Sequence, residues 1–549
     1  MGIDFALPIH YTAVMTNRPW YKFYDPGVPT SLSYPAVPLQ NFLEESARKT
    51  PEKACTIFNN SVTTFGEMND LTDQLAGGLV QLGIGKGDRV GIFLSNSPQF
   101  VLAYFGILKA GGVVVATNPS YTPPEIEYQV NDAGIRFMFV SDSAYARLKE
   151  VRSKTQLQSL IVTGKRTPQP GDLRIDDLLG GNYSSTVSVQ TEDIALLQYS
   201  GGTTGLAKGA VVLHRNLVAN TLQFKAWMLN LEEGKEITLL AIPMYHVYGM
   251  VCGMCLSLAL GACMVLVPDP RSIGELLGTI QKYHPTYFPA VPTLYNAINN
   301  HPDVQAGKYD LSSIKACISG SAPLMKETKE KFEKLTGGRI CEGYGLSEAP
   351  TATHCNPLMG ANKIRSIGLP LPDVDCRIVD VDTGKTEVPR GDVGELILKG
   401  PQVMKGYHNQ LEESAQALRG GWLFTGDLAR MDADGYFSIV DRKKELIKPD
   451  GWQVWPCEVE EAIATHPKVR EVGVAGVPDA YHGEAVKAWV VIKAGEILSE
   501  DDVCAWCQNR LAGYKIPTQV EFRSELPRSS IGKVLRRELV RQHKEGSKG

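Results

Sequence analysis

Glycines, hydroxyl residues and a lysine are concentrated in the segment DIALLQYSGGTTGLAKGAVVLH, residues 193–214. An apolar run leads into the stretch from Ser200 to Gly205, and Lys208 follows before a second apolar run. Glycines let backbone N–H groups approach an anion, hydroxyls add donors, and a lysine adds positive charge. The segment therefore predicts a phosphate-binding loop between two strands.

This loop differs from a Walker A loop, in which a glycine precedes the lysine and a serine or threonine follows it. Ala207 and Gly209 occupy these two places. The sequence also lacks a G-x-S-x-G nucleophile elbow, so it does not indicate covalent catalysis by serine.

Short apolar runs alternate with helical stretches in the first part of the chain. We expect strands at residues 88–96, 111–119, 136–142 and 159–164, and a helix at 100–110. Such alternation is typical of parallel sheets with crossover helices. The predicted fold is therefore α/β.

The pattern changes to strands and turns from about residue 373, which fits a smaller β-rich layer. A last stretch begins with the charged DRKKE at 441–445 and ends in a basic, helix-like tail. Charge-rich turns mark linkers better than apolar runs do. We predict a large N-terminal domain, residues 1–441, and a small α+β C-terminal domain, residues 442–549.

Length and charge limit the classes of function. A chain of 549 residues is several times the usual domain size, so at least two folding units are expected. The net charge of -4 leaves no cationic excess for nucleic-acid binding. Eleven cysteines, many in apolar stretches, favour a reducing compartment, and we find no secretory signal. We expect a cytoplasmic protein that does not bind nucleic acid.

The uncharged stretch from Tyr248 to Pro268 has the length of a membrane span. Its glycines divide it, so we predict a buried helix followed by a strand. The C-x-x-C spacings at Cys252 and Cys504 lack the second cysteine pair or the histidines that a zinc site needs.

The phosphate-loop segment YSGGTTGLAKG resembles the signature of the adenylate-forming superfamily of acyl-CoA synthetases, luciferases and peptide-synthetase adenylation domains. Further segments resemble signatures of that family in the same order, from about residue 40 to the end of the chain. They are PMYHVYG (243–249), SGSAPL (319–324), EGYGLSEAP (342–350), GWLFTGDLAR (421–430), DRKKELIKPDGWQVWPCEVEE (441–461) and PRSSIGKVLRREL (527–539).

The resemblance implies a reaction in two steps. A carboxylate attacks the α-phosphorus of ATP to give an acyl adenylate and pyrophosphate, and the thiol of coenzyme A then displaces AMP. Because two anions meet in the first step, positioning and charge neutralisation matter more than a nucleophilic side chain. ATP and CoA are thus expected as co-substrates, Mg²⁺ as cofactor, and the C-terminal domain as a mobile lid.

By resemblance, Lys533 reaches the reacting carboxylate and the α-phosphate, Glu348 ligates Mg²⁺, and His246 lies at the mouth of the acyl pocket. Lys444 is expected at the hinge. The residues expected along the CoA channel are Lys448, Gly451 and Trp452. The residues expected to bind the nucleotide are Ser200, Gly201, Thr203, Thr204, Lys208, Gly320, Ser321, Ala322, Glu342, Gly343, Tyr344, Gly345, Ser347, Asp427 and Arg442.

Several of these nucleotide-binding residues have individual roles in the resemblance. Tyr344 is expected to stack on adenine beside a wall formed by Gly320 to Pro323. Asp427 is expected to accept hydrogen bonds from both ribose hydroxyls, a task suited to a carboxylate, while Arg442 supports the ribose and phosphate.

Within the family, the chain resembles bacterial medium- and long-chain fatty acid ligases through EGYGLSEA, KGPQVMKGY, GGWLFTGD and its proline-rich N-terminal region. No basic residue stands beside the expected pocket segments, which favours a neutral, apolar acyl group. Asp450, Trp452 and Trp455 stand where relatives commonly carry other residues, including Asn and Tyr. An alicyclic or aromatic acid is therefore an alternative substrate.

Three other functions are alternatives: an adenylation domain that loads a carrier protein, a luciferase-like oxidase, and a non-catalytic nucleotide-binding regulator. The first lacks a carrier domain, and the second lacks any residue pattern for oxygen chemistry. The third is disfavoured by the retention of Lys208, Glu348, Asp427, Arg442 and Lys533. The sequence leaves peripheral membrane contact and a homodimer open.

Overall fold

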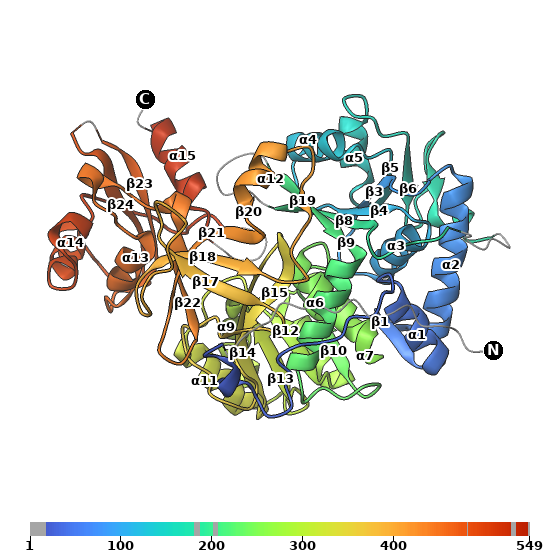
Figure 1. Ribbon diagram of the computed structural model, residues 1–549, viewed down its shortest axis with the longest axis horizontal. Helices are drawn as coiled ribbons and strands as arrows, with labels where there is room; N and C mark the ends of the chain where they lie inside the picture. The colour runs from blue at the N-terminus through green and yellow to red at the C-terminus, as the bar shows by residue number, and fades with distance from the viewer. Residues whose placement is uncertain (1–17, 181–186, 201–206, 480, 529–533, 547–549) are drawn as a thin grey trace. The chain divides into compact units, whose positions relative to one another are not determined.

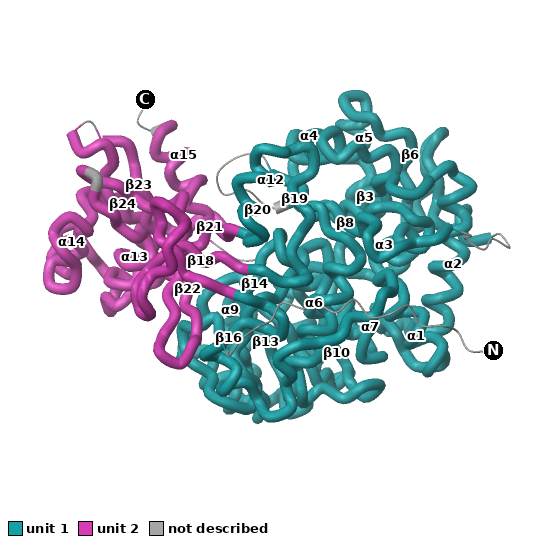
Figure 2. The backbone as a smooth tube through the Cα atoms, viewed as in Figure 1, with its two compact units in different colours: residues 1–201, 207–375, 399–423 teal, residues 202–206, 376–398, 424–549 magenta. Residues whose placement is uncertain are grey.

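The structure is a computed structural model that describes residues 18–180, 187–200, 207–479, 481–528 and 534–546. The chain divides into two compact units, which are coloured separately in Figure 2. Unit 1 comprises residues 1–201, 207–375 and 399–423, and unit 2 comprises residues 202–206, 376–398 and 424–549. The predicted division into domains of residues 1–441 and 442–549 stays a prediction.

Two sheets form the framework of unit 1 (Figure 1). The strands of the first are β1 (Ala54–Phe58), β2 (Ser61–Thr64), β10 (Ile237–Leu240), β11 (Cys263–Leu266), β12 (Tyr287–Ala290), β13 (Ala316–Ser319), β14 (Arg339–Leu346), β15 (Ala349–Cys355) and β16 (Leu369–Pro370). Those of the second are β3 (Arg89–Phe93), β4 (Val113–Ala116), β5 (Phe137–Val140), β6 (Ser159–Val162), β7 (Leu173–Arg174), β8 (Ile194–Ser200), β9 (Lys208–Leu213) and β19 (Gly406–Tyr407).

The central strands of both sheets run parallel. Antiparallel pairs lie at both edges of the first sheet and at the β19 edge of the second. The orders are β16-β15-β14-β13-β12-β10-β11-β1-β2 and β19-β9-β8-β4-β3-β5-β6-β7. Parallel pairing joins β1, β11, β10, β12, β13 and β14 in the first sheet, and β8, β4, β3, β5, β6 and β7 in the second. The predicted α/β fold is confirmed.

Helices connect these strands and cover the sheets. They are α1 (Asn41–Lys49), α2 (Phe65–Gln81), α3 (Pro98–Lys109), α4 (Pro123–Ala133), α5 (Tyr145–Arg152), α6 (His214–Trp227), α7 (Leu256–Leu260), α8 (Ile273–Tyr283), α9 (Pro292–Asn299), α10 (Pro302–Gln305), α11 (Lys326–Thr336) and α12 (Leu411–Ala417). Shorter elements are η1 (Tyr21–Phe23), η2 (Ile175–Leu178), η3 (Tyr248–Cys255) and β20 (Leu418–Arg419).

The predicted strands at 88–96, 111–119, 136–142 and 159–164 correspond to β3, β4, β5 and β6, and the helix at 100–110 corresponds to α3. The helix begins two residues earlier because Ser97 caps it: its hydroxyl accepts from the Phe100 N–H at 3.3 Å, and Pro98 follows. Side chains of β5 and β6 pack against α4 and α5 in one buried cluster, which includes Met138, Leu160 and Ile126.

The uncharged stretch after Tyr248 forms η3, a π-helical segment, then α7 and the buried strand β11. Gly261 ends α7 in the left-handed conformation, with φ of 61°. This confirms the predicted helix and strand. Among the described residues, the helices are all too short or too polar to cross a bilayer.

Unit 2 contains the strand-and-turn region and the C-terminal elements. The first group is β17 (Asp375–Val379), β18 (Gly394–Lys399), β21 (Trp422–Met431) and β22 (Phe437–Arg442), in which β18 and β22 both pair with β21. The second is η4 (Lys443–Glu445), η5 (Pro449–Gly451), α13 (Pro456–Ala464), β23 (Val469–Asp479), β24 (Gly483–Ile492), α14 (Glu500–Gln508), η6 (Gly513–Lys515), β25 (Gln519–Phe522) and α15 (Arg536–Gly546).

The sheet β23-β24-β25 is covered by helices through two separate buried clusters. Val459 of α13 and Val503 of α14 pack with Val474 and Val490 in one cluster. Leu539 of α15 packs with Trp489 in the other. Alternate side chains of a strand point to opposite faces, so this small sheet has apolar cover on both sides.

Candidate active site

The predicted phosphate loop connects β8 to β9, where Ser200 and Lys208 are opposite each other in the antiparallel register. Gly201, Thr203 and Thr204 lie outside the described residues. Helix α4 contacts both flanks of this connection. The Tyr199 hydroxyl donates to Asp132 Oδ2, and the Tyr128 hydroxyl donates to the Ala207 carbonyl at 2.9 Å.

Lys208 contacts an acidic side chain and an aromatic ring. Its ammonium pairs with the carboxylate of Glu413 on α12, and its Nζ lies 5.3 Å from the ring centroid of Tyr407. The lysine side chain is 26% exposed. A cation held at the end of a strand, beside a loop rich in glycine and hydroxyls, is suited to contact a phosphate.

Ser347 and Glu348 form the turn between β14 and β15, where the chain reverses at the edge of the parallel strands. The Tyr407 hydroxyl donates to Glu348 Oε1 at 2.8 Å, and the Met404 N–H donates to the Glu348 carbonyl at 2.8 Å. Burial and the adjacent Glu348 raise the pKa of Tyr407, so its hydroxyl stays a donor. Tyr407 thus lies next to both Lys208 and Glu348.

The end of β14 approaches β15 so closely that one position has to be glycine. A Cβ on Gly345 would lie 1.1 Å from the Thr351 carbonyl oxygen, and one on Gly343 would lie 3.3 Å from the His354 carbonyl oxygen. Tyr344 lies between these glycines, half-buried, with its ring edge-on to His354 at 5.9 Å between centroids.

Glu342 is the buried acid of this strand, 7% exposed. Burial raises the pKa of its carboxyl from 4.5 to about 8, against the lowering effect of the Leu324 N–H and of Lys329. Leu324 donates to Glu342 Oε1 at 3.4 Å. The side chain therefore ties β14 to the segment that contains Gly320, Ser321 and Ala322.

That segment follows β13, and Tyr248 supports it. The Tyr248 hydroxyl lies within hydrogen-bond distance of the carbonyl oxygens of Ile318, at 2.7 Å, and Ala290, at 3.0 Å. A Cβ on Gly320 would lie 3.4 Å from the Tyr248 ring. Ser321 has φ of 72°, a left-handed conformation unusual for a non-glycine residue.

His246 lies two residues before Tyr248, whose N–H donates to His246 Nδ1 at 3.2 Å. Burial lowers the pKa of the imidazole from 6.5 to about 4, so the ring is neutral near pH 7. A neutral imidazole beside the buried η3 segment offers contact without adding charge.

In unit 2, Asp427 and Arg442 are opposite each other in the antiparallel pair β21 and β22. Arg442 Nε lies 3.2 Å from Asp427 Oδ1, and the aspartate is 6% exposed. The Asp427 N–H donates to Thr425 Oγ1 at 3.1 Å. The structure therefore brings these two predicted ribose-binding residues together as an ion pair.

The other predicted residues of unit 2 lie in the turns after β22. Lys444 is exposed within η4, and Lys448 is exposed and donates its backbone N–H to Glu484 Oε2 at 2.7 Å. Gly451 ends η5, and the next residue, Trp452, is 59% exposed and stacks on Tyr514 at 5.0 Å between centroids. Lys533 lies outside the described residues.

Magnesium is the metal that the resemblance implies. Across the part of the chain that the structure describes, no group of three or more His, Cys, Asp or Glu side chains could hold a metal alone. Mg²⁺ bound to a nucleotide needs one or two protein carboxylates, because phosphates and water supply its other ligands. The half-buried Glu348, near Lys208, fits such a site.

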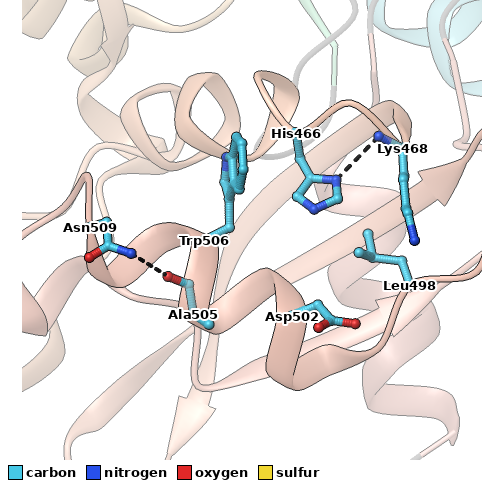
Figure 3. Close-up of a pocket in the computed structure, with 7 residues that line it drawn as sticks. All are labelled: His466, Lys468, Leu498, Asp502, Ala505, Trp506 and Asn509. Atoms are coloured by element: carbon cyan, nitrogen blue, oxygen red, sulfur yellow. Dashed lines mark hydrogen bonds between the residues drawn. The ribbon is translucent and has the colours of Figure 1, made fainter.

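A surface pocket of about 350 Å³ lies in unit 2, away in sequence from the predicted site residues (Figure 3). Its lining residues are His466, Lys468, Leu498, Asp502, Ala505, Trp506 and Asn509. Trp506 contacts His466 edge-on at 4.6 Å, and the Arg510 guanidinium covers its ring at 3.6 Å. Arg510 and His466 already contact the Trp506 ring. We therefore do not include this pocket in the candidate active site.

Sequence reasoning missed three residues that organise the site: Tyr407, Glu413 and Tyr248. Tyr407 belongs to the segment KGPQVMKGY, whose resemblance to fatty acid ligases was the available signal. Glu413 had none, because it meets Lys208 from 205 residues away in the chain.

Comparisons with known proteins identify the family of the chain. The AMP-binding enzyme family matches residues 43–408, and the AMP-binding enzyme C-terminal domain matches residues 458–533. The long-chain-fatty-acid–CoA ligase of Bacillus subtilis (strain 168) is 42% identical over 97% of this chain and 99% of its own. That of Escherichia coli O6:H1 is 37% identical over 95% and 98%.

Solved structures are similar over nearly the whole chain. The anthranilate CoA ligase AuaEII in complex with anthranoyl-AMP has a TM-score of 0.83 and 29% identity, covering 94% of this chain and 98% of its own. ATP-bound MatB from Rhodopseudomonas palustris has a TM-score of 0.82 and 29% identity, covering 93% and 99%. With these two regions matched over most of its length, the chain belongs to the AMP-binding enzyme family.

Proposed function

We propose that this protein is an AMP-forming acyl-CoA ligase that activates an apolar, medium- to long-chain fatty acid with ATP and transfers the acyl group to CoA. The observation that carries the proposal is the placement of Lys208 and Glu348 around Tyr407. Support also comes from full-length similarity to proteins named long-chain-fatty-acid–CoA ligases, at 33–42% identity.

In the first step the fatty acid carboxylate attacks the α-phosphorus of ATP, the bond to pyrophosphate breaks, and an acyl adenylate forms. Both reactants are anions, so positive groups must lower their repulsion. Lys208 contributes a cation at the phosphate loop, and Lys533 supplies a second at the reacting carboxylate. Glu348 would hold Mg²⁺, and the bound ion would neutralise phosphate charge.

Asp427 and Arg442 bind the ribose in this proposal. Their ion pair, with 3.2 Å between Arg442 Nε and Asp427 Oδ1, holds a carboxylate that can accept two hydroxyl hydrogen bonds. Tyr344 and the backbone from Gly320 to Ala322 hold the adenine.

In the second step the CoA thiol attacks the acyl carbonyl, AMP leaves, and the thioester forms. Lys444 is the hinge about which the C-terminal part moves between the two steps. Lys448, Gly451 and Trp452 then face the pantetheine channel. The protein acts in the cytoplasm.

Fatty acids are the first candidate substrates, and alicyclic or aromatic acids are the second. The neutral His246 and the apolar segment after it favour an uncharged chain. Trp452 and Trp455 favour an alicyclic or aromatic acid as the second candidate, and AuaEII is named as an anthranilate ligase.

The test is a panel of carboxylic acids that differ in length and ring content, scored by pyrophosphate release and by CoA thioester. Fatty acids should give the highest kcat/KM, and a preference for ring acids would replace the first candidate by the second. Lys533→Ala should abolish pyrophosphate release but retain thioester formation from supplied acyl adenylate. Glu348→Gln should raise the Mg²⁺ requirement. The absence of an acyl adenylate with every acid would refute the function itself.

A further inference from the structure

Arg536, the first residue of α15, has its guanidinium buried among three carboxylates. Its Nη1 lies 3.1 Å from Asp441 Oδ1 and also pairs with Glu445, and its Nη2 lies 2.7 Å from Glu460 Oε2. The arginine side chain is 13% exposed, and Nη2 also lies 3.1 Å from Cys457 Sγ. A buried cation with several carboxylate partners is held far more firmly than a surface ion pair.

Asp441 uses both carboxylate oxygens in this cluster. Oδ1 accepts from Arg536 and from the Arg442 N–H at 2.8 Å, while Oδ2 accepts from the Cys457 N–H at 2.8 Å. Cys457 is in the first turn of α13, so Asp441 is bound to two helices that follow it in the chain. Its side chain is 1% exposed.

The three acids lie on different sides of Lys444. Asp441 precedes it, whereas Glu445, Glu460 and Arg536 follow it. A change of backbone conformation at Lys444 therefore alters the distance from Asp441 to Arg536. It leaves the distance from Glu460 to Arg536 unchanged, because both residues are on the same side.

We propose that the Arg536–Asp441 ion pair is a latch across the hinge, and that Arg536 is a positioning residue for the ligase reaction. The proposal rests on the ligase function and on the hinge at Lys444. While the pair is closed, the segment from Asp441 to Glu445 keeps its present conformation. The half-reaction that requires the other conformation proceeds only after the pair opens.

The test compares Asp441→Asn with Glu460→Gln. Both substitutions remove one negative charge from the same guanidinium, but only the first acts across Lys444. Two rates are measured in the full-length enzyme: pyrophosphate release from ATP and fatty acid, and thioester formation from supplied acyl adenylate and CoA. Thermal unfolding is recorded for each variant.

Asp441→Asn should change the ratio of the two rates by about tenfold, the effect of one hydrogen bond to a charged group. Glu460→Gln should lower the unfolding temperature but hold that ratio within about twofold of the wild type. Arg536→Lys, which retains the charge and loses the second N–H contact, should shift the ratio in the same direction as Asp441→Asn.

An unchanged ratio in Asp441→Asn would overturn the latch, as would equal shifts in both acid variants. That second result would mean that the cluster only stabilises unit 2. Measurements on the wild-type enzyme distinguish a wrong latch proposal from a wrong ligase proposal. If it forms acyl adenylate and thioester, the ligase assignment stands whatever the ratios show.

Discussion

The Tyr407 hydroxyl donates a hydrogen bond of 2.8 Å to Glu348 Oε1, across 59 residues of sequence. The same tyrosine ring lies 5.3 Å from Lys208 Nζ. One side chain thus contacts the carboxylate expected to hold Mg²⁺ and the lysine expected to contact phosphate. Tyr407 fixes the orientation of a carboxylate that would otherwise rotate freely in its half-buried turn.

Tyr407→Phe should raise the Mg²⁺ concentration needed for half-maximal pyrophosphate release by about tenfold, because groups that orient a metal ligand affect metal affinity to this extent. A magnesium titration of the adenylation step measures it. Tyr283→Phe is the control, since it removes a surface hydrogen bond of 2.7 Å to Asn60. Identical magnesium titration curves for wild type and Tyr407→Phe would show that Tyr407 does not orient Glu348.

Glu413→Gln should release Lys208 from its carboxylate partner and lower the KM for ATP. The KM should fall by about twofold to fivefold, the range expected for a partly exposed ion pair. Steady-state kinetics at saturating fatty acid and CoA measure it. Glu412→Gln, one residue earlier on α12 and exposed, should leave the KM for ATP unchanged. A higher KM in Glu413→Gln would show that Glu413 assists the lysine and does not compete for it.

Glu342→Gln should stabilise the protein, by an amount that grows with pH. Below about pH 4.5 the carboxyl is protonated in both the folded and the unfolded chain, so its ionisation does not change the free energy of unfolding. Between 4.5 and about 8 the unfolded chain releases the proton while the buried group keeps it. Wild type therefore loses stability relative to the variant over this window, on the order of a few kcal/mol in total.

The measurement for Glu342 is the free energy of unfolding of both proteins in denaturant, at pH values spanning this window. Glu330→Gln on α11 is the control, because Glu330 is an exposed glutamate in an i,i+4 pair with Lys326. A difference between Glu342→Gln and wild type that is flat with pH would contradict the buried, protonated carboxyl.

Trp452→Ala should raise the KM for CoA about fivefold to tenfold, because it removes an exposed aromatic surface that stacks on Tyr514. Pyrophosphate release in the absence of CoA should keep its wild-type rate. Tyr481→Ala, at an aromatic side chain that is 92% exposed in the same unit, is the control for general loss of surface. Equal damage to both half-reactions would place Trp452 outside the CoA channel.

The sequence predicted the strands and helices of unit 1 well, since local patterns fix them. Residues 159–164 are an apolar run that forms the buried β6, and most of the helix predicted at 100–110 lies within α3, which begins at Pro98. The run after Tyr248 was separable from a membrane span because glycine breaks it. The observed start of α3 lies two residues before the predicted start, because the Ser97 cap determines where its first turn begins.

The candidate site was predictable in its residue types and not in its contacts. Lys208 was predicted from the residue types of its loop, and Glu348 and Asp427 were predicted from the resemblance of their motifs to those of the family. The partners of the first two, Glu413 and Tyr407, come from distant segments and were not predicted. Arg442, the partner of Asp427 on the neighbouring strand, was itself among the predicted residues.

The sequence alone therefore determined the α/β architecture, through the short-range spacing of its apolar residues. It also implied the adenylate-forming chemistry, through the resemblance of its ordered motifs to those of a known family. The tertiary structure alone decided which groups neutralise, orient or bury one another. Tyr407 beside Glu348, the protonated Glu342 and the Arg536 cluster around Asp441 depend on burial and on distances between segments far apart in the chain. Electrostatic effects of burial arise only when the folded chain excludes water from those groups.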